Sequence, residues 1–259
     1  MNLTSAHLAA LKHVPVCEKN TWEAVLTNIY GTQNVIEAAV RNTVEMLVDV
    51  STDKAVDPFN FYGTTKAIGE KLVINSNFNF ATETKFVCIR GGNVIGTNGS
   101  VIPLFKQQIQ KNNQITITNP NMTRFLMSTK QAIELIFEVI ANAVGGELFV
   151  MKMPGTTVGL LGDVLIDLFG SSTTSKMVIG ERPGEKIHEV LLSKNEQPYA
   201  YEFSDSNFVI LPTLAPPSLK ARYEHLPHLE SIEFNSQNTM QLDKASLTKI
   251  LRAENWLFS

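Results

Sequence analysis

The sequence predicts an α/β fold in which helices cover both faces of a parallel β-sheet. Helical and strand-like segments alternate over the first 150 residues, and two of the strand-like segments, MLVDVS at 46–51 and KFVCIR at 85–90, are almost continuously apolar. Strands that are buried on both faces have this pattern, whereas half-exposed strands alternate apolar and polar residues. The alternation of strands with helices indicates βαβ units and therefore parallel pairing.

Amphipathic helices are expected between these strands. In the segment 21–41 the apolar residues recur near helical spacing, at Val25, Ile29, Val35, Ile36 and Ala39. Further helices are expected at 63–76, 100–111 and 128–144, the last with Ser128 as its N-cap, and strand character resumes in GGELFVMKM at 145–153.

The pattern changes after about residue 155. Strand-like segments become shorter and prolines more frequent, KIHEVLLSKNE (186–196) is the one short helix expected, and 212–230 is a proline-interrupted surface segment. We therefore expect two domains: residues 1–155 as an α/β domain and residues 156–259 as a smaller α+β lobe.

Composition excludes several classes of protein. The chain has 259 residues, 44% hydrophobic and 18% charged, with a net charge of −3 and no basic stretch, so neither a nucleic-acid nor a membrane partner is expected. Its two cysteines, Cys17 and Cys88, form no CxxC pair, so we expect neither a metal site nor a disulfide. No signal peptide or membrane-spanning run is seen, and we expect a cytoplasmic protein.

The segment STDKAVDPFNFYGTTK at 51–66 contains the residues with the clearest chemical meaning. Tyr62 and Lys66 lie one helical turn apart, so both side chains share a face of the expected helix. An ammonium group beside a phenol lowers its pKa from about 10 toward neutrality. The phenolate can then remove the proton of a hydroxyl while a cofactor accepts hydride. By itself the pair is also compatible with a solvated helix face.

The context of this pair favours a site. Thr52, Asp53 and Lys54 directly follow the strand 46–51, and the carboxyl ends of parallel strands are where ligands bind in open α/β sheets. A helix cap or a surface ion pair between Asp53 and Lys54 would explain one of these groups. A hydroxyl, a carboxyl, an ammonium and a phenol within one strand–loop–helix unit are better explained by catalysis.

This segment resembles the active-site segment of the extended short-chain dehydrogenase/reductases (NAD-dependent epimerase/dehydratase family). Within them it is similar to the inverting UDP-N-acetylglucosamine 4,6-dehydratases of polysaccharide biosynthesis, which have Asp-Lys where other sugar-nucleotide dehydratases have Asp-Glu. The resemblance extends from about residue 7 to the end and is carried by further blocks: HLAALKHVPVCEKN, TNIYGTQNVIEAA, GGNVIGTNGSVIPLF, NPNMTRFLMSTKQAIELI, GGELFVMKMP and GERPGEKIHEVLLSKNE. It implies an N-terminally truncated Rossmann-like, doubly wound parallel sheet with a smaller substrate lobe.

The resemblance also implies a mechanism and site residues. Tyr62 and Lys66 would act at the 4-hydroxyl, held by Thr52, while a protonated Asp53 and a neutral Lys54 would serve as acid and base for eliminating water across C5 and C6. Contacts to an NAD or NADP cofactor would come from Tyr62, Lys66, Ala9 and Asn28. Contacts to a UDP-sugar substrate would come from Asn93, Arg124, Arg182 and Glu185. Arg124 pairing with Glu134 or another acid, and Arg182 serving as a turn residue, remain as alternatives.

Two departures from the family pattern matter. The family begins with a strand and a glycine-rich turn that binds the dinucleotide pyrophosphate, and residues 1–20 contain no such turn. We therefore expect about 80 residues to be absent, at roughly 30 per βαβ unit; this leaves NAD and NADP undistinguished and an exposed sheet edge that makes a homo-oligomer plausible. In addition, Asp49 lies in a strand position where the family is apolar, and a buried carboxylate without a partner is costly.

Three functions follow as hypotheses. The first is a C5-inverting 4,6-dehydratase acting on UDP-N-acetylglucosamine. The second is a non-catalytic remnant that at most binds a nucleotide-sugar, which the missing glycine turn favours. The third is a C4- or C2-epimerase of the same substrate, which would not need Asp53 as an acid.

Overall fold

The computed structural model describes residues 3–96, 100–182, 184–230 and 233–254. The chain forms two compact units. The sheet unit consists of Met1–Gly91, Ile133–Lys152 and Val190–Phe234, and the second unit of Gly92–Ala132, Met153–Glu189 and Asn235–Ser259. The units alternate along the chain, so the division differs from the single boundary expected near residue 155.

A six-stranded sheet forms the centre of the sheet unit. Its strand order is β1 (Thr4–His7), β2 (Met46–Thr52), β3 (Lys85–Gly91), β7 (Leu148–Met151), β12 (Asn207–Ile210) and β11 (Ala200–Glu202). The first four strands pair in parallel, as the apolar runs predict, and β12 and β11 continue the sheet in antiparallel pairing. The parallel α/β prediction is therefore confirmed.

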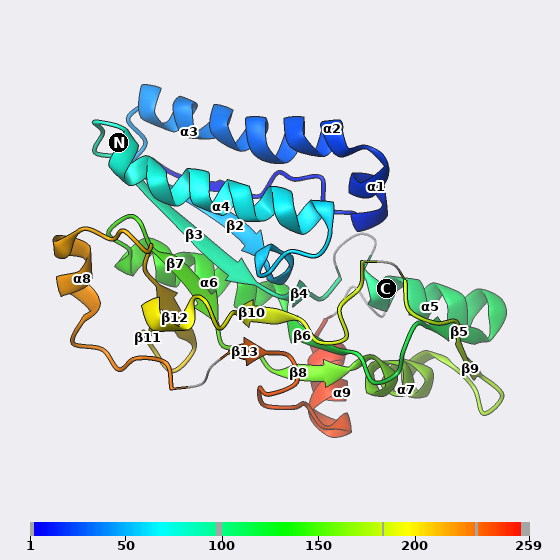
Figure 1. Cartoon of the computed structure of the whole chain (residues 1–259). Helices are drawn as coiled ribbons and strands as arrows, with labels where there is room; N and C mark the ends of the chain where they lie inside the picture. The colour runs from blue at the N-terminus through cyan, green and yellow to red at the C-terminus, as the bar shows by residue number, and fades with distance from the viewer. Residues whose placement is uncertain (1–2, 97–99, 183, 231–232, 255–259) are drawn as a thin grey trace. The chain divides into compact units, whose positions relative to one another are not determined.

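Helices cover this sheet on both faces (Figure 1). On one face lie α3 (Gly31–Arg41) and α4 (Phe61–Asn79), and on the other lie α6 (Thr129–Asn142) and α8 (Pro217–Tyr223). The remaining elements of this unit are α1 (Val14–Lys19), α2 (Thr21–Val25), a π-helix (Leu26–Tyr30), two 3₁₀-helices (Asp53–Ala55 and Gln197–Tyr199) and β10 (Val190–Leu192), which pairs with β13 (Phe234–Asn235). The helix expected at 21–41 is therefore present, with a π-helical turn in its middle.

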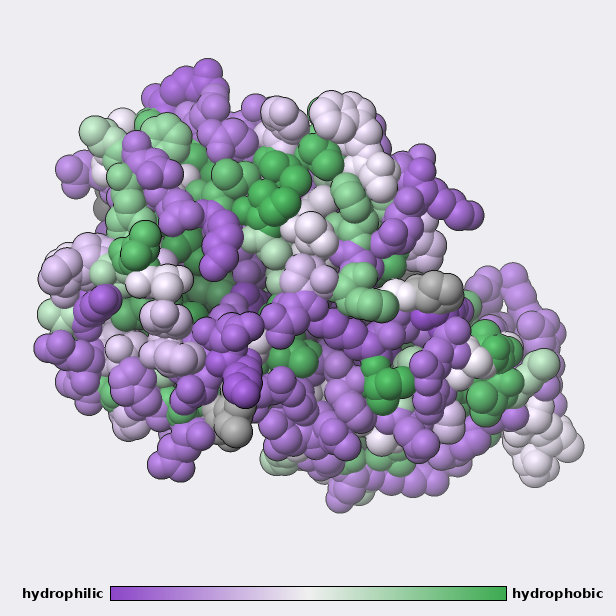
Figure 2. All heavy atoms as spheres, viewed as in Figure 1, coloured by the Kyte–Doolittle hydropathy of each residue, from purple (hydrophilic) through white to green (hydrophobic). Residues whose placement is uncertain are grey.

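The two faces of the sheet differ in chemistry. Met46 and Val48 of β2 pack with Leu135 of α6 and Leu219 of α8 in an apolar cluster. Because side chains alternate along a strand, Leu47, Asp49 and Ser51 point to the opposite face, which α3 and α4 cover. This second face therefore holds buried polar groups. Figure 2 shows apolar side chains gathered in the upper part of the view, where α3 and α4 lie in Figure 1. Exposed apolar residues of α4 include Ile68 and Phe78.

The second unit has its own core. Three helices, α5 (Val101–Asn112), α7 (Val158–Phe169) and α9 (Lys244–Ala253), pack with a three-stranded sheet of β4 (Asn93–Val94), β6 (Thr123–Met127) and β8 (Gly155–Thr157) and a parallel pair of β5 (Gln114–Ile117) and β9 (Ser175–Val178). The core includes Phe105, Ile115, Met122, Leu161 and Leu247.

Several predicted elements are confirmed and others are wrong. Ser128 caps α6 in a reciprocal pair with Gln131, in which its hydroxyl accepts the Gln131 N–H at 3.1 Å. The short helix expected at 186–196 is wrong, since that segment contains β10 followed by a turn. The sequence analysis also missed α7, in which only Asp163 and Asp167, one turn apart, interrupt the apolar residues, so that its helical periodicity is weakly marked.

Candidate active site

The end of β2 and the start of α4 bring the predicted catalytic residues together in the sheet unit. Asn60 caps α4 by accepting the Gly63 N–H at 2.9 Å. Gly63 is required by a close approach, because a Cβ atom there would lie 2.1 Å from the backbone oxygen of Lys54. The first turn of α4, which carries Tyr62, is therefore held against the loop that carries Asp53 and Lys54.

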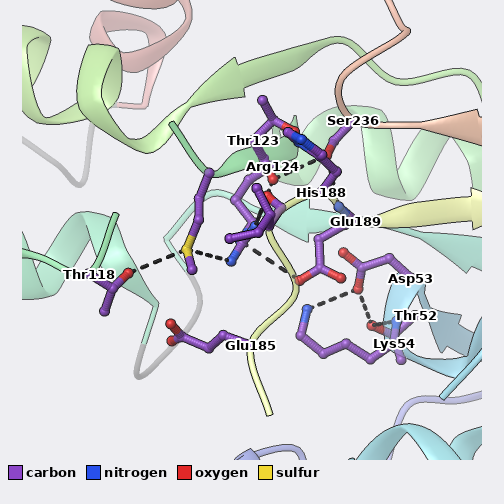
Figure 3. Close-up of polar contacts among 12 residues, drawn as sticks. Thr52, Asp53, Lys54, Thr118, Thr123, Arg124, Glu185, His188, Glu189 and Ser236 are labelled. Atoms are coloured by element: carbon purple, nitrogen blue, oxygen red, sulfur yellow. Dashed lines mark hydrogen bonds and ion pairs between the residues drawn. The ribbon is translucent and has the colours of Figure 1, made fainter. Parts of the chain in front are cut away.

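Thr52, Asp53 and Lys54 share one hydrogen-bonded group (Figure 3). The Thr52 hydroxyl donates to Oδ1 of Asp53 at 2.8 Å, and Nζ of Lys54 donates to the same oxygen at 3.0 Å. Asp53 is only 1% exposed, and its other oxygen, Oδ2, has no hydrogen-bond partner among the residues that the structure describes. An orphaned acceptor of this kind is where a ligand hydroxyl would donate.

The ionisation of Tyr62 differs from the expectation. Its ring packs in an apolar cluster with Cys17 and Ala24 and is 8% exposed. This burial raises the pKa of Tyr62 above 10, although Lys66 and Lys54 and a hydrogen bond to Thr52 act in the opposite direction. The prediction of a pKa lowered toward neutrality is therefore wrong, because desolvation by α1 and α2 outweighs the nearby cations.

Lys66 is also buried, and its partner is Asp49. Nζ of Lys66 lies 3.4 Å from each carboxylate oxygen of Asp49. The Lys66 side chain is 5% exposed and the Asp49 side chain is 1% exposed. The carboxylate that looked costly in the sequence is thus paired, and the Lys66 ammonium interacts both with Asp49 of the sheet and with the Tyr62 phenol.

The two other predicted cofactor contacts lie in the same unit. Ala9 is exposed in the loop after β1. Asn28 is buried within the π-helix, where it accepts from Leu11 N at 2.7 Å and donates to Leu11 O at 3.0 Å and to Thr65 Oγ1 at 2.9 Å. Its carbonyl and both amide protons are therefore engaged, and Asn28 fastens the loop after β1 to α4.

Arg124, in the second unit, is bound by its own surroundings. It donates to the backbone oxygens of Thr123 at 2.7 Å and Ile187 at 3.2 Å, and its Nε lies 3.7 Å from Glu189. The alternative of an acidic partner is therefore realised, with Glu189 as that acid. Figure 3 shows the Arg124 contacts together with the neighbouring bonds from Thr123 Oγ1 to His188 Nδ1, 2.8 Å, and Ser236 Oγ, 2.6 Å.

The other predicted substrate residues also lie in the second unit. Arg182 is exposed, and its backbone N–H donates to Oε2 of Glu185 at 3.4 Å, which places both in one turn. Asn93 lies in β4, and its buried Oδ1 has no hydrogen-bond partner among the described residues. Of this group, Arg182 has the most accessible side chain and Asn93 has an unused acceptor.

One cluster escaped the sequence reading. Arg90, at the end of β3, donates to both carboxylate oxygens of Glu70, at 3.0 and 2.6 Å, and to both of Glu196, at 3.0 and 2.9 Å. Glu70 lies four residues after Lys66 and eight after Tyr62, and this helical spacing was the signal in the sequence. The cluster joins β3, α4 and the segment after β10.

Two wider searches cover only the described part of the chain. No group of three or more histidines, cysteines, aspartates or glutamates could hold a metal ion there. No helix among these residues has the length and apolar character needed to cross a membrane.

A nicotinamide cofactor can be tested against this geometry. Residues 3–96 contain no glycine-rich turn leading from a strand into a helix N-terminus, so they lack the usual pyrophosphate site. Ala9, exposed after β1, and Tyr62, beside the end of β2, lie at the carboxyl ends of neighbouring parallel strands. This edge suits the nicotinamide end of a dinucleotide.

Comparison with known proteins shows related sequences. The family described as polysaccharide biosynthesis protein matches residues 3–210. The UDP-glucose 4-epimerase of Rickettsia canadensis is 43% identical over 200 residues, 77% of this chain and 58% of the relative. The inverting UDP-N-acetylglucosamine 4,6-dehydratase of Campylobacter jejuni is 39% identical over 211 residues, 80% of this chain and 61% of the relative. The chain thus spans about three fifths of the length of these two enzymes.

Two other matches, one to a sequence and one to a solved structure, cover nearly the whole chain. A Methanocaldococcus jannaschii protein named uncharacterized membrane protein MJ1061 is 39% identical over 258 residues, 97% of this chain and 74% of that protein. The X-ray structure of Pen from Bacillus thuringiensis has a TM-score of 0.87 and 38% identity over 97% of this chain and 75% of its own.

A more distant structure shows the fold alone. It is the dTDP-glucose 4,6-dehydratase DesIV of Streptomyces venezuelae, with NAD bound; its TM-score is 0.64 at 21% identity, over 71% of this chain and 62% of its own. The likeness establishes a Rossmann-like α/β fold. Because the family match covers most of its length, the chain belongs to the polysaccharide biosynthesis protein family, among the nucleotide-sugar dehydratases and epimerases of the extended short-chain dehydrogenase/reductases.

Proposed function

We propose that this chain has the chemistry of a C5-inverting nucleotide-sugar 4,6-dehydratase, with UDP-N-acetylglucosamine as substrate. The observation that supports it most is the hydrogen-bonded group of Thr52, Asp53 and Lys54 beside Tyr62 at the carboxyl end of β2. An epimerase needs only a hydroxyl base, whereas a dehydratase also needs an acid and a second base on neighbouring carbons. Asp53 and Lys54 provide that additional pair.

The first part of the reaction acts on the 4-hydroxyl. The Thr52 hydroxyl donates a hydrogen bond to Asp53. The Thr52 oxygen can therefore accept a hydrogen bond from the substrate hydroxyl or from the phenol. Tyr62 takes up the hydroxyl proton once its phenol is ionised. A bound nicotinamide supplies the chemistry of removing hydride from C4 and returning it to C6.

The elimination uses the proton shared by Lys54 and Asp53. Transfer of this proton along their 3.0 Å hydrogen bond converts an ion pair into a neutral amine and a carboxylic acid. The amine of Lys54 then removes the C5 proton, which the C4 ketone has acidified, while Asp53 gives its proton to the departing 6-hydroxyl. The C5–H and C6–O bonds break, a C5–C6 double bond forms and water leaves. Reprotonation of C5 from the opposite face inverts that centre.

Substrate recognition is assigned to the second unit. We assign the diphosphate to Arg182, whose guanidinium is exposed, and to Asn93. Glu185 would accept hydrogen bonds from ribose hydroxyls. Arg124 is assigned a less direct part in binding, because its guanidinium already contacts Thr123, Ile187, Met122 and Glu189.

A 4-epimerase is the second candidate, and the 43% identity to an enzyme of that name favours it. The test is incubation of the purified protein with UDP-N-acetylglucosamine and either NAD or NADP in D₂O, followed by NMR. A 4-keto-6-deoxy product carrying deuterium at C5 supports the dehydratase. A C4 epimer that keeps its 6-hydroxyl would establish the epimerase instead. Neither product, together with no detectable cofactor binding, would leave the remnant.

Two variants make this assay specific. Tyr62→Phe removes the base for the first step and should abolish both products. Lys71→Met changes an exposed lysine on the same helix and should leave turnover unchanged. Product formation that survives in Tyr62→Phe would contradict the proposed mechanism.

A further inference from the structure

The ion pair between Asp49 and Lys66 connects the middle of the sheet to the catalytic helix. Lys66 lies one turn after Tyr62 on α4, and its ammonium is 3.4 Å from both oxygens of Asp49 on β2. Both side chains are almost completely buried. The two charges are far apart in the sequence but adjacent in space. Because little solvent screens them, they interact strongly.

The carboxylate is fixed by the strands around it. Asp49 pairs in register with His7 of β1 and with Cys88 of β3, so it lies in a central strand whose backbone is bonded on both sides. His7 is in turn held by Thr32, whose hydroxyl lies 3.2 Å from its Nε2. Asp49 therefore cannot follow the ammonium if Lys66 moves. Lys66 has a long, flexible side chain, so its ammonium is the group that can change position.

The pair determines where the positive charge acts. A lone ammonium one turn from a phenol stabilises the phenolate, whereas an ammonium paired with a carboxylate presents a dipole, whose field falls off more steeply. Burial lowers the pKa of Lys66, but the Asp49 carboxylate together with Tyr62, Cys88 and Glu70 raises it above its ordinary value. Burial likewise raises the pKa of Tyr62, and the cations do not reverse that rise.

We propose that Asp49 is a positioning residue: its carboxylate holds the Lys66 ammonium at the sheet and thereby limits how strongly this cation acts on the Tyr62 phenol. Breaking the pair releases the cation toward the phenol and turns Tyr62 into a base. A ligand that offers Lys66 another acceptor would have the same effect. The catalytic consequence rests on the proposed function, but the effect on the phenol does not.

Other charged groups near this pair also influence the pKa values of Tyr62, Lys66 and Asp49. The groups that act on Tyr62, Lys66 or Asp49 come from every element packed around them: His7 of β1, Lys54 and Asp53 of the loop after β2, Cys88 of β3 and Glu70 of α4. Besides burial, the groups that act most strongly on the pKa of Tyr62 are Lys66, Lys54, Asp53 and Thr52. A double substitution separates an effect of Asp49 that passes through Lys66 from a direct effect of its charge on the phenol.

The experiment follows the phenol by NMR in protein labelled with ¹³C at the tyrosine ζ carbon. The chain has five tyrosines, and the Tyr62 signal is the one that Tyr62→Phe removes. Asp49→Asn keeps the shape of the side chain and removes its charge, and Asp49→Leu replaces it with an apolar side chain of similar size. In both, the midpoint of the Tyr62 titration should fall by about one pH unit or more, which corresponds to a roughly tenfold increase in phenolate at a fixed pH.

Three controls separate this role from a general disturbance. In a Lys66→Met background, Asp49→Asn should shift the Tyr62 midpoint far less than it does when Lys66 is present. Ser51→Ala changes the next residue on the same face of β2 without changing charge and should also have no effect. Circular dichroism confirms that each variant is folded. An unchanged midpoint in folded Asp49→Asn, or an equal shift in the Lys66→Met background, would overturn the proposal.

A second measurement on the unaltered protein applies even if the Asp49 variants do not fold. A buried ammonium held by a carboxylate exchanges its protons slowly, so ¹⁵N-lysine NMR should show a resolved Nζ signal that Lys66→Met removes. Exchange as fast as that of exposed lysines would refute the pairing. Neither measurement uses substrate or cofactor, so a failed turnover assay with these results intact would count against the proposed function alone.

Discussion

Nζ of Lys54 lies 3.0 Å from Oδ1 of Asp53, so the two residues assigned as base and acid share a hydrogen bond before any substrate is present. The sequence reading assigned a neutral amine and a protonated acid. The structure shows an ion pair from which one proton transfer produces both. Substitution of either residue should therefore affect both roles.

Lys54→Met should abolish exchange of the C5 proton with solvent while C4 oxidation continues. The amine that removes this proton is lost, and general base catalysis typically contributes a factor of about 10²–10⁴. Deuterium incorporation at C5, followed by NMR, measures the first effect, and nicotinamide absorbance measures the second. Persistent C5 exchange would show that another group is the base.

Arg90→Met should destabilise the protein by about 3–5 kcal/mol, because it leaves the buried carboxylate of Glu70 without its partner. Urea denaturation measures the change in the free energy of unfolding. Arg41→Met is the matched control: it removes an exposed pair with Glu37, 3.3 Å apart, and should cost no more than about 0.5 kcal/mol. Equal costs for the two variants would contradict the structural role of Arg90.

Glu196 predicts a dependence of stability on pH. Although burial acts to raise its pKa, Arg90 lowers it below the ordinary value. A folded-state pKa below the unfolded one stabilises the protein above the unfolded value, about 4.3, and this contribution is lost as the pH falls through the folded value. Glu196→Gln should therefore flatten the fall in unfolding free energy below about pH 4.3. A slope identical to that of the unaltered protein would exclude this contribution.

Tyr223→Phe should cost about 1–3 kcal/mol of unfolding free energy. The Tyr223 hydroxyl donates to Oε1 of Glu147 at 2.7 Å, and this carboxylate is completely buried. The backbone N–H groups of Val144 and Gly145, both at 2.7 Å, are its other donors and remain in the variant. Thermal and urea denaturation measure the loss, and Tyr30→Phe, at an exposed tyrosine, should change nothing.

Arg124 and Arg182 should respond differently to substitution. Arg182→Met removes an exposed guanidinium and should weaken UDP-sugar binding without altering stability. Arg124→Met removes donors to two backbone oxygens and should lower stability. Calorimetric titration with UDP and urea denaturation separate the two effects. Unchanged UDP affinity in Arg182→Met would remove it from the substrate site.

Local chemistry explains which parts were predictable. Apolar runs revealed β2 and β3, helical spacing revealed α3 and α4, and the Ser128 cap was visible as a short polar signal. The pattern failed where packing decides: in α7 only two aspartates interrupt the apolar residues, and the segment 186–196 becomes a short strand because it pairs with β13. The position of Arg90 between Glu70 and Glu196 joins residues more than 100 positions apart, which no local pattern encodes.

The sequence by itself determined the parallel α/β architecture and the set of groups at the end of β2, because periodicity and side-chain chemistry are properties of short segments. Only the tertiary structure decided how those groups ionise. Burial of Tyr62 by α1 and α2 raises its pKa, and Asp49, three strand residues before Thr52, takes up the ammonium of Lys66. Desolvation and ion pairing depend on what lies around a residue in space, and spacing along the chain does not specify that.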